Sequence, residues 1–433
     1  MRDFLPADKA QRERVLGVIR NTFRSHGFDE IETPVMEDSN RLHAGLGGDN
    51  EKLAFAVMKR ALTTDDLRAA EQPLDLADLG LRFDLTVPLA RFYASHRGEL
   101  PTVFRSIQIG AVWRAERPQK GRYRQFMQCD IDIIGEAGPI AEVELITATV
   151  ATIDALGLDG CSIRINDRRL LTSALTLLGF PPKEHEPVLV TIDKLDKIGH
   201  DGVITELRDR GFPAGPVDAL DDFFTRPMTT QATTPATTQL TTQAPAQLTT
   251  QAPPFGEAVI RRLLPEGVDP VAVTELAAIG VAATRVVGRD VVQFDPWLVR
   301  GMGYYTGTIF EVAHPSLSYS LGGGGRYDGM IGRFLGSDVP AVGFSLGFER
   351  LVELVELEGP EGADSVALIH DPAMSPTALL TLKAAIVADG RRVRVERRPK
   401  NVKPLLDQLV AAGFGSYAFV DESTVTPEFR QLG

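Results

Sequence analysis

The sequence has little cysteine and no long apolar segment. Cys129 and Cys161 are its only cysteines, which excludes a disulfide framework and a zinc site of four cysteines. No apolar run approaches the roughly 20 residues of a membrane span, and the first residues, Met-Arg-Asp-Phe-Leu-Pro, lack the apolar core of a signal peptide. These absences predict a reduced, cytoplasmic protein that has no membrane partner.

Several catalytic signatures are missing as well. The 7 histidines show no metal-ligand spacing, and no Ser/His/Asp arrangement is visible. The lysine motif that cradles phosphates and the glycine fingerprint of dinucleotide-binding proteins are absent too. We therefore expect no metal-ligating residues, and a nucleotide would have to be bound by another device.

What is present is enough apolar sequence for several domains. The chain has 433 residues, of which 43% are apolar and 24% charged, so it can bury a sizeable core. Its length suggests about three domains. The formal net charge of −12 argues against a surface coated with basic residues, although a local basic patch is compatible with it.

Composition and periodicity divide the chain into parts. Residues 1–159 and 291–356 are predicted to form one core in two pieces, interrupted by a separate inserted module at 160–290. Within that module, residues 227–256 carry no charge and repeat Thr-Thr-Gln, a composition typical of disorder. Residues 364–433 alternate strands with helices, which predicts a small parallel α/β domain.

Arginine lies in strands whose residues alternate between polar and apolar. In the segment that starts at Val112, a period of two places Arg114 and Glu116 on one face. A cationic loop around Gly121 follows, and the next strand puts a ring, an amide and two carboxylates on a single face: Phe126, Gln128, Asp130 and Asp132. Two strands joined by this loop predict a hairpin with a polar face, which either binds a ligand or is simply solvated.

Three further segments carry residues of the same kind. A strand predicted at 81–86 would place Arg82, Asp84 and Thr86 together, and another strand is predicted from Arg300. Four consecutive glycines at 322–325 either allow close backbone approach to a ligand or form a flexible turn. The segment 343–350 leads into an apolar helix near Leu351 and ends in an arginine, which is costly to bury unless it meets an anion or a carboxylate.

Together these segments predict one site with two kinds of charge. The arginine fork matches phosphate oxygens bidentately, whereas carboxylates suit an ammonium group or an imidazole N–H. A site that needs both would bind a nucleoside triphosphate beside an amino acid.

These residues carry a resemblance to the class II aminoacyl-tRNA synthetases, in their histidyl form. Residues 113–126 are similar to the second signature motif of that family, residues 28–37 to the first and residues 343–350 to the third. Residues 298–305 and 323–329 resemble the two motifs that are specific to histidine.

The resemblance implies both an α+β fold and an enzymatic activity. The fold would be a six-stranded antiparallel sheet flanked by helices, with an inserted helical module, a C-terminal α/β anticodon-binding domain and assembly into a homodimer. The implied activity is that of a histidine–tRNA ligase, whose partners are L-histidine, tRNA and ATP with Mg²⁺.

The resemblance also implies roles for single residues. Three arginines would be catalytic, with Arg114 and Arg300 on opposite sides of the α-phosphate and Arg350 at the far phosphates. ATP would also meet Glu116, Arg122 and Phe126. Histidine would be bound by Asp84, Leu85, Thr86, Gln128, Asp132, Tyr304 and Tyr305.

Two departures from the family pattern keep alternatives open. Position 303 is glycine where the family usually has aspartate, and the chain stops at Gly433, so we expect altered pocket support and a shortened anticodon-binding domain. The alternatives are a catalytically inactive regulatory subunit of ATP phosphoribosyltransferase, and a paralogue that activates histidine for an acceptor other than tRNA.

A basic cluster remains in the C-terminal domain. Between 391 and 403 only Glu396 opposes its charge. The cluster is either a solvated edge strand protected by charge or a surface that contacts tRNA phosphates. Its members are Arg391, Arg392, Arg394, Arg397, Arg398, Lys400 and Lys403.

Overall fold

The computed structural model describes residues 1–43, 54–116, 123–225, 255–300, 303–357 and 365–432. They form two compact units, which are described separately below. The larger unit consists of Met1 and residues 17–355, and the smaller one consists of residues 2–16 and 356–433.

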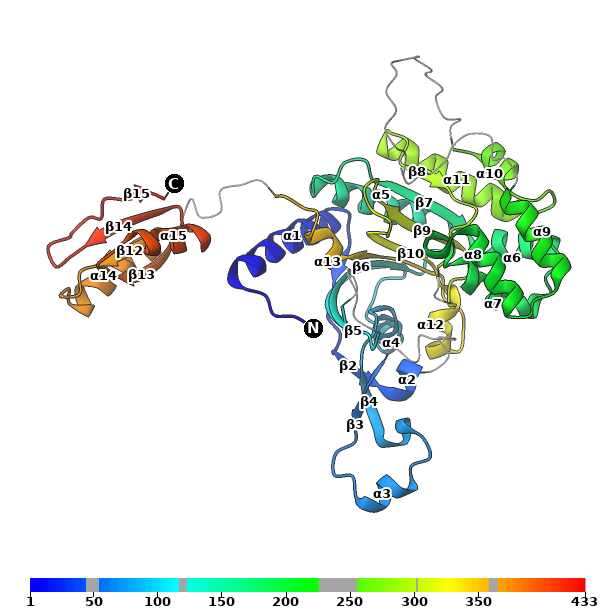
Figure 1. Ribbon diagram of the computed structural model, residues 1–433, viewed down its shortest axis with the longest axis horizontal. Coiled ribbons are helices and arrows are strands. Elements are labelled where there is room, and N and C mark those ends of the chain that lie inside the picture. The colour runs from blue at the N-terminus through cyan, green and yellow to red at the C-terminus, as the bar shows by residue number, and fades with distance from the viewer. Residues whose placement is uncertain (44–53, 117–122, 226–254, 301–302, 358–364, 433) are drawn as a thin grey trace, which may run out of the picture. The chain divides into compact units, whose positions relative to one another are not determined.

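The larger unit is built on one mixed sheet (Figure 1). Its six inner strands pair antiparallel throughout, which confirms the predicted antiparallel core, and a short parallel strand is added at each edge. Among the described residues its strands, in spatial order, are β1 (Asp29–Glu30), β5 (Phe104–Trp113), β6 (Gln125–Ile134), β11 (Ala341–Gly347), β10 (Gly322–Arg326), β9 (Thr308–Ala313), β7 (Ser162–Asp167) and β8 (Val292–Phe294).

The predicted hairpin is formed by β5 and β6. Their register runs from Phe104 opposite Ile134 to Trp113 opposite Gln125. The alternation predicted for β6 is observed, because Cys129, Ile131 and Ile133 are fully buried while the polar residues between them face a pocket.

Helices α5 (Ile140–Ala155) and α11 (Pro270–Val287) pack against each other and against strands of the sheet (Figure 1). Helix α5 ends just before Gly157, which has the left-handed φ of 70° that glycine tolerates best. Helices α4 (Thr86–His96) and α12 (Asp328–Leu335) also pack together. Helix α1 (Pro6–Ser25) is the first helix of the chain.

The sequence predicts no apolar segment long enough to span a membrane, but helix α11 meets that criterion. Of the part of the chain that the structure describes, it is the helix long and apolar enough to cross a membrane by length and composition. Its Val273, Leu276 and Ile279 are buried where it packs on α5, α10 and the sheet, which is the environment of a core helix.

The range 160–290 is predicted to be a separate module. It contributes strand β7 to the main sheet and helix α11 to the layer that packs on that sheet. The part outside the sheet is the helical run from α6 onward, and of the predicted disordered segment only Phe255 and Gly256 lie within the described residues. The run comprises α6 (Arg168–Leu177), α7 (Pro182–Ile192), α8 (Leu195–Asp209), α9 (Ala214–Thr225) and α10 (Glu257–Leu263).

A second sheet has the strand order β2-β4-β3, and its strands lie between β1 and β5 in the sequence. The short helices α2 (Ser39–His43) and α3 (Thr64–Ala69) belong to the same stretch of the chain. Its strands are β2 (Met36–Asp38), β3 (Phe55–Met58) and β4 (Ala77–Leu81). The strand predicted at 81–86 was wrong, because β4 ends at Leu81 and α4 begins at Thr86. The Asp84 carboxylate accepts the Val87 N–H at 3.2 Å, and this bond turns the chain into the helix.

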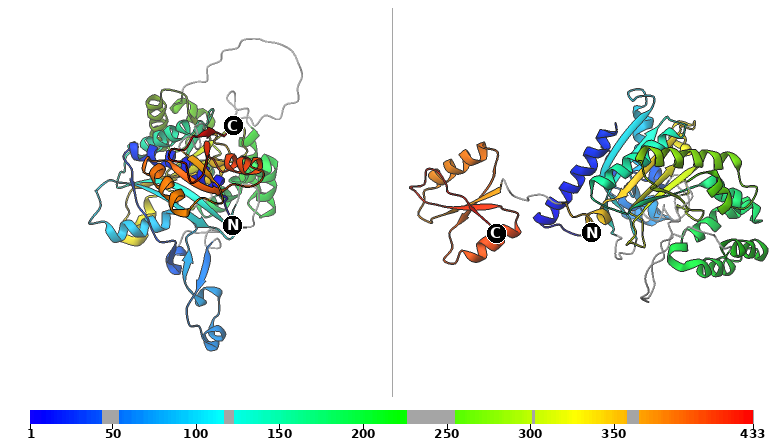
Figure 2. Two further views of the ribbon diagram at one scale, coloured as in Figure 1. Left: turned by 90° about the vertical axis from the view of Figure 1, so that its left-hand side faces the viewer. Right: turned by 90° about the horizontal axis from the view of Figure 1, so that it is seen from above.

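The smaller unit confirms the predicted α/β alternation. Strands β13 (Arg392–Arg397), β12 (Ser365–His370) and β14 (Ser416–Val420) are parallel, and β15 (Arg430–Gln431) is added antiparallel. Helices α14 (Pro376–Ala388) and α15 (Lys403–Ala411) cover opposite faces of this sheet (Figure 2). Along β12, Val366 and Leu368 pack in the α14 cluster, while Ala367 and Ile369 pack in the α15 cluster.

Candidate active site

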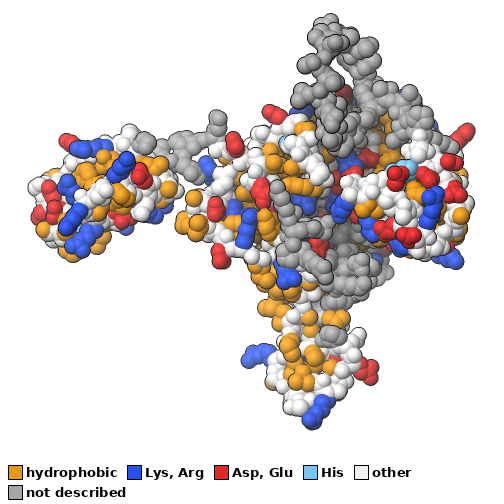
Figure 3. All heavy atoms as spheres, viewed as in Figure 1, with side chains coloured by type: hydrophobic (Ala, Val, Ile, Leu, Met, Phe, Trp, Pro, Cys, Tyr) orange, Lys and Arg blue, Asp and Glu red, His pale blue; other side chains and the backbone are white. Residues whose placement is uncertain are grey.

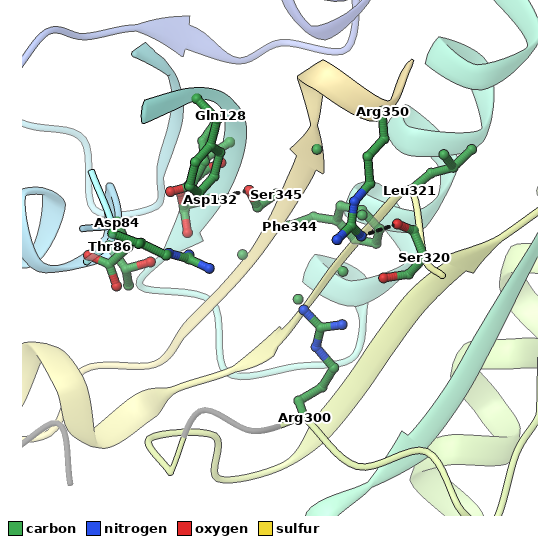
Figure 4. A pocket seen from close by; sticks show the side chains of 18 of the residues that line it. Asp84, Thr86, Gln128, Asp132, Arg300, Ser320, Leu321, Phe344, Ser345 and Arg350 are labelled. Atoms are coloured by element: carbon green, nitrogen blue, oxygen red, sulfur yellow. Dashed lines mark hydrogen bonds between the residues drawn. The ribbon is translucent and has the colours of Figure 1, made fainter. Parts of the chain in front are cut away.

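A pocket of about 270 Å³ opens over the middle of the main sheet. It is lined by β6, β10 and β11, by the start of α4, by the residues that follow β5 and by the short helix α13 (Phe348–Val352). Figure 4 shows Arg300 and Arg350 pointing into one end of it from different elements, with Asp84, Thr86 and Asp132 at the other end. The two kinds of charge predicted from the sequence therefore share one cavity.

The acidic end of the pocket holds three buried carboxylates, those of Asp84, Asp130 and Asp132. The Tyr327 hydroxyl donates to Asp132 Oδ1 at 2.6 Å. Gln128, on the same strand as Asp132, donates from its side-chain amide to the hydroxyl of Ser345 on the neighbouring strand β11 at 2.8 Å. These bonds hold the Asp132 carboxylate and the Gln128 amide in place before any ligand arrives.

Burial disfavours the ionised form of these carboxylates when no ligand is bound, and so raises their pKa values. It raises the pKa of Asp84 to about 6, against the effects of the Val87 N–H and of the Arg114 charge. Burial also raises the pKa of Asp132 to about 7, although the Tyr327 hydrogen bond opposes the shift. The pKa of Asp130 is raised well above its usual range by burial and by the charge of Asp132. A cationic ligand would reverse these shifts by pairing with the ionised forms.

Buried acceptor atoms here lack partners among the described residues. They are Asp84 Oδ2, Gln128 Oε1 and Asp130 Oδ1. A buried polar atom without a hydrogen bond destabilises a protein by about 1–3 kcal/mol, so its retention needs an explanation. All of these residues line the pocket, and a ligand that offers N–H donors, such as an ammonium group, would satisfy them.

Three arginines from different segments of the chain line the pocket. Arg114, just after β5, donates from Nε to the Phe83 carbonyl at 3.1 Å and lies 5.0 Å over the Phe126 ring. Arg350 in α13 donates to the Ser320 carbonyl (Figure 4). Arg300 donates from Nη1 to Glu311 Oε2 at 2.7 Å.

The charge of Arg300 is secured by its surroundings. Burial alone would lower its pKa, but the carboxylates of Glu311 and Asp193 raise it above the ordinary value. Its Nε has no partner among the described residues. This arrangement leaves a permanent cation at the pocket with a donor to spare, which suits a phosphate oxygen.

Glycines in β10 and β11 make room for these side chains. A Cβ on Gly343 would stand 1.9 Å from Asp132 Oδ1, and one on Gly323 would stand 2.7 Å from the Arg300 guanidinium carbon. The glycine run is therefore a strand inside the sheet, and the alternative of a flexible turn was wrong. Its lack of side chains allows the close approach that the sequence suggested.

Most residues predicted for the site meet in this pocket. Leu85 does not, because its side chain is buried in the core and its carbonyl accepts the Gln108 amide at 3.1 Å. Arg122 lies outside the described residues. The residues that line the pocket as predicted are Asp84, Thr86, Arg114, Glu116, Phe126, Gln128, Asp132, Arg300, Tyr304, Tyr305 and Arg350.

The sequence prediction also left out residues that line the pocket. Asp130 had been placed on the correct face by the period of two, yet it was not chosen as a site residue. Ser345 and Tyr327 lie within the motif segments, and only their hydrogen bonds to Gln128 and Asp132 reveal their part.

Gly303, the departure from the family pattern, is exposed. The two tyrosines that follow it are buried and line the pocket, and their rings lie 4.7 Å apart. The substitution at this position therefore leaves both rings at the site.

No group of three His, Cys, Asp or Glu side chains suited to a metal ion occurs among the described residues. Single carboxylates do line the arginine end, and Glu349 beside Arg350 is one of them. A metal bound there would need most of its ligands from the substrate.

Comparison with known proteins gives a consistent result. A family model described as histidyl-tRNA synthetase matches residues 1–351. A histidine–tRNA ligase of Leifsonia xyli subsp. xyli is 58% identical, over 98% of this chain and 95% of the relative. A probable histidine–tRNA ligase of Tropheryma whipplei is 41% identical, over 97% of this chain and 94% of the relative.

Solved structures share the fold. A crystal structure of a histidyl-tRNA synthetase from a Nostoc species superposes with a TM-score of 0.73 at 24% identity, covering 100% of this chain and 93% of the other. A structure from Bacillus halodurans, titled as an ATP phosphoribosyltransferase regulatory subunit/histidyl-tRNA synthetase, gives a TM-score of 0.70 at 20% identity, covering 97% and 96%.

Proposed function

This chain belongs to the histidyl-tRNA synthetase family, and we therefore propose that the pocket binds histidine at its carboxylate end and ATP at its arginine end. The enzyme is a ligase that activates histidine with ATP and transfers it to tRNA. The observation that carries the assignment of residues is the convergence of Arg114, Arg300 and Arg350 with three buried carboxylates in one cavity.

Histidine carries the N–H donors that the buried acceptor atoms at the acidic end need as partners. Its ammonium would donate to the partnerless acceptors of Asp84, Gln128 and Asp130. Its imidazole would pair with Asp132, whose other contact is the Tyr327 hydroxyl. Thr86, Tyr304 and Tyr305 complete the walls. A site whose buried polar groups would be left unpaired rejects analogues that cannot pair with them.

The arginines would bind the triphosphate. Arg114 and Arg300 would approach the α-phosphate from different segments of the chain, Arg350 would reach the outer phosphates, and Phe126 with Glu116 would meet the adenine. A carboxylate oxygen of histidine attacks the α-phosphorus as the bond to pyrophosphate breaks, and negative charge grows on the equatorial oxygens. Fixed cations stabilise that charge without reorganising. No protein nucleophile takes part, which agrees with the absence of a Ser/His/Asp motif.

In the second step a terminal ribose hydroxyl of tRNA attacks the carbonyl carbon of the histidyl-adenylate, and AMP leaves. Mg²⁺ would enter with ATP, since such ions keep phosphate ligands and need only one or two protein carboxylates. Glu349 is of the right type, and the ion would neutralise phosphate charge there.

The remaining assignments are also proposals. Residues 1–159 and 291–356 form the catalytic core, and residues 364–433 form an anticodon-binding domain. Its arginines support this assignment, because Arg392 and Arg394 both stack on Phe414, at 4.5 and 4.6 Å, which holds charge at the edge strand β13. Since its substrates are tRNA, ATP and free histidine, we infer a cytoplasmic location.

A homodimer is supported by an apolar surface on the second sheet. Hydrophobic side chains gather over β2, β3 and β4 (Figure 3). Met36, Met58 and Leu79 are 45%, 60% and 37% exposed, and an exposed apolar patch of this kind is typical of a protein interface. Met36 lies in the segment that resembles the first motif, to which the family assigns the dimer contact.

The regulatory alternative has less support, because relatives that match nearly the whole chain are named as ligases, and the likeness to the Bacillus halodurans structure concerns the fold alone. Histidine-dependent exchange of pyrophosphate into ATP separates the candidates. Exchange with tRNA charging supports the ligase, exchange without charging supports another acceptor, and no exchange supports a regulatory subunit.

Replacement of Arg300 tests the assignment of residues. Arg300→Ala should reduce the exchange rate by roughly 100- to 1,000-fold, the usual effect of removing one group that stabilises transition-state charge. The dissociation constant of histidine, measured by calorimetry, should stay unchanged. Arg289→Ala is the control, because Arg289 forms an exposed ion pair with Asp154 outside the pocket. Full exchange activity in Arg300→Ala would contradict the assignment.

A further inference from the structure

Arg300 stands at the end of a segment, residues 295–300, that leads from β8 to the pocket. We call it the arginine segment. It lies outside the helices and strands of the described residues, and its backbone bonds, from Asp295 N–H to the Ile165 carbonyl at 3.0 Å and from Leu298 N–H to the Asp295 carbonyl at 3.1 Å, stop short of Arg300. Something else must therefore fix the guanidinium, because an arginine side chain loses rotamer entropy when it is held in one conformation.

Strand β7 holds the beginning of the arginine segment. Arg164 and Asn166 lie two residues apart and so share a face of the strand. Arg164 Nε donates to Asp295 Oδ2 at 2.6 Å. The Asn166 amide donates to the carbonyls of Pro296 and Leu298, both at 3.2 Å. These bonds fix the path of the backbone up to two residues before Arg300.

Strand β9 holds the end of the segment through Glu311. This residue stands directly opposite Arg164 in the register of β7 and β9. Its Oε2 accepts from Arg300 at 2.7 Å, and its Oε1 accepts from Arg164 at 3.3 Å. One carboxylate is thus shared between a guanidinium at the pocket and one in the sheet.

The surroundings make this carboxylate hard to replace. The side chain of Glu311 is 14% exposed and that of Arg300 is 24% exposed. Asp193, at the end of α7, adds a second negative charge near Arg300, and Asp196 in α8 binds Arg164 at 3.2 Å. Gly323, the register partner of Glu311 on β10, leaves room for the guanidinium, whose carbon lies only 2.7 Å from where a Cβ on Gly323 would stand.

We propose that Glu311 is a positioning residue that holds the Arg300 guanidinium in the orientation needed for the α-phosphate, with Arg164 and Asn166 fixing the backbone behind it. The proposal rests on the role of Arg300 given above. Charge stabilisation in the transition state depends on donors that are already in place, and a misplacement of about 1 Å can lower a rate by roughly 100-fold.

The shared carboxylate explains why an acid is needed at this position. A carboxylate offers acceptors to both guanidinium groups at once. An amide of the same shape offers one acceptor oxygen and an NH₂ group, and the NH₂ group would face the donors of Arg300 or of Arg164. In Glu311→Gln one of the two arginines therefore loses its partner, while the volume of the side chain stays the same.

The test is the exchange kinetics of Glu311→Gln in the full chain. The exchange kcat should fall by roughly 10- to 100-fold, with an unchanged KM for histidine, because Glu311 does not line the histidine end. Glu144→Gln is the matched control. It breaks a partly buried ion pair, with Arg105 at 2.6 Å, that does not line the pocket, and it should keep the wild-type kcat.

A double-mutant cycle separates positioning from a general structural effect. The readout is the affinity for a non-hydrolysable sulfamoyl analogue of histidyl-adenylate. If Glu311 acts through Arg300, then Glu311→Gln weakens binding in the wild-type background and adds no loss in the Arg300→Ala background. Equal losses in both backgrounds, or a wild-type kcat in Glu311→Gln, would overturn the proposal. An unaffected Arg300→Ala would instead refute the role proposed above for Arg300.

Discussion

At Asp84, ligand binding and folding stability favour opposite charge states of the same carboxyl group. Its carboxylate begins α4 through the Val87 N–H, and it is also buried beside Asp132, whose pKa its charge raises. The ionised form is needed to bind an ammonium group, yet burial disfavours that form in the absence of ligand. Function and stability therefore select different charge states of this side chain, as expected at a binding site.

This opposition predicts a pH-dependent gain in stability for Asp84→Asn. The pKa of Asp84 is raised from 3.8 to about 6 in the folded, ligand-free protein. A raised carboxyl pKa means that folding is favoured below 3.8 and that this contribution is lost as the pH rises through 6. The neutral amide avoids the loss, so Asp84→Asn should be more stable than the wild type at pH 8 by about 1–3 kcal/mol, and equal to it at low pH.

Urea unfolding at both pH values measures this difference, and calorimetry should show that the variant no longer binds histidine. Asp66 provides a control of opposite sign, because hydrogen bonds from Thr63 lower its pKa. Asp66→Asn should therefore be no more stable than the wild type at pH 8. Equal stabilities of Asp84→Asn and wild type at pH 8 would show that the Asp84 carboxylate is not strained by burial.

Among the secondary-structure elements, β10 and β11 act through the side chains they lack. Gly322 to Gly325 pair with both neighbouring strands, so the backbone is fully engaged while the space above it is filled by Arg300 and Tyr305 from other segments. A strand of ordinary residues would fill this space itself. Because these glycines have no side chains, this part of the sheet face forms the floor of the pocket.

The glycines should therefore be sensitive to a single methyl group. Gly343→Ala would place a Cβ 1.9 Å from Asp132 Oδ1 and displace the carboxylate from the imidazole site. The KM for histidine should rise by roughly 10- to 100-fold, the effect of losing a hydrogen bond to a charged group, with little change in the KM for ATP.

Gly329→Ala in α12 is the matched control, because a Cβ there would meet nothing within 4 Å. Steady-state exchange kinetics of both variants provide the comparison. A wild-type KM for histidine in Gly343→Ala would mean that Asp132 does not contact the substrate.

The molecule as a whole consists of two units that carry different features. The larger unit holds the pocket, whereas the smaller unit carries the basic cluster on and after β13. That strand lies at the edge of its sheet, and Arg398 stacks 4.6 Å over the Phe419 ring. Ordered cations at an edge both discourage strand pairing and suit a phosphate backbone.

Charge reversal distinguishes these two roles. Replacing Arg397 and Arg398 by glutamate should weaken tRNA binding and reduce the slope of log affinity against log salt by roughly one for each phosphate that is no longer bound. Filter binding at several salt concentrations measures it, and histidine-dependent exchange should stay normal. Lys383→Glu, in α14 of the same unit, serves as the control. A salt slope equal to that of the wild type would leave only the protective role.

Local sequence was sufficient to predict most elements and the chemical character of the site. Ser375 and Pro376 set the start of α14, and the hydroxyl of Ser375 accepts the Ala378 N–H at 3.2 Å. The period of two in β6 placed Asp130 and Asp132 on one face. Such signals arise from neighbouring residues, which is why they can be recognised before the fold is known.

Which distant residues share a function depended on how the chain packs in three dimensions. The strand predicted at 81–86 gave way to a turn into α4, and Leu85 went to the core instead of the pocket. Glu311 gained its meaning from lying opposite Arg164 in a register that pairs strands far apart in the sequence. The physical reason is that sheet register and burial are set by the packing of the whole unit, while the local pattern sets only which face a side chain can take.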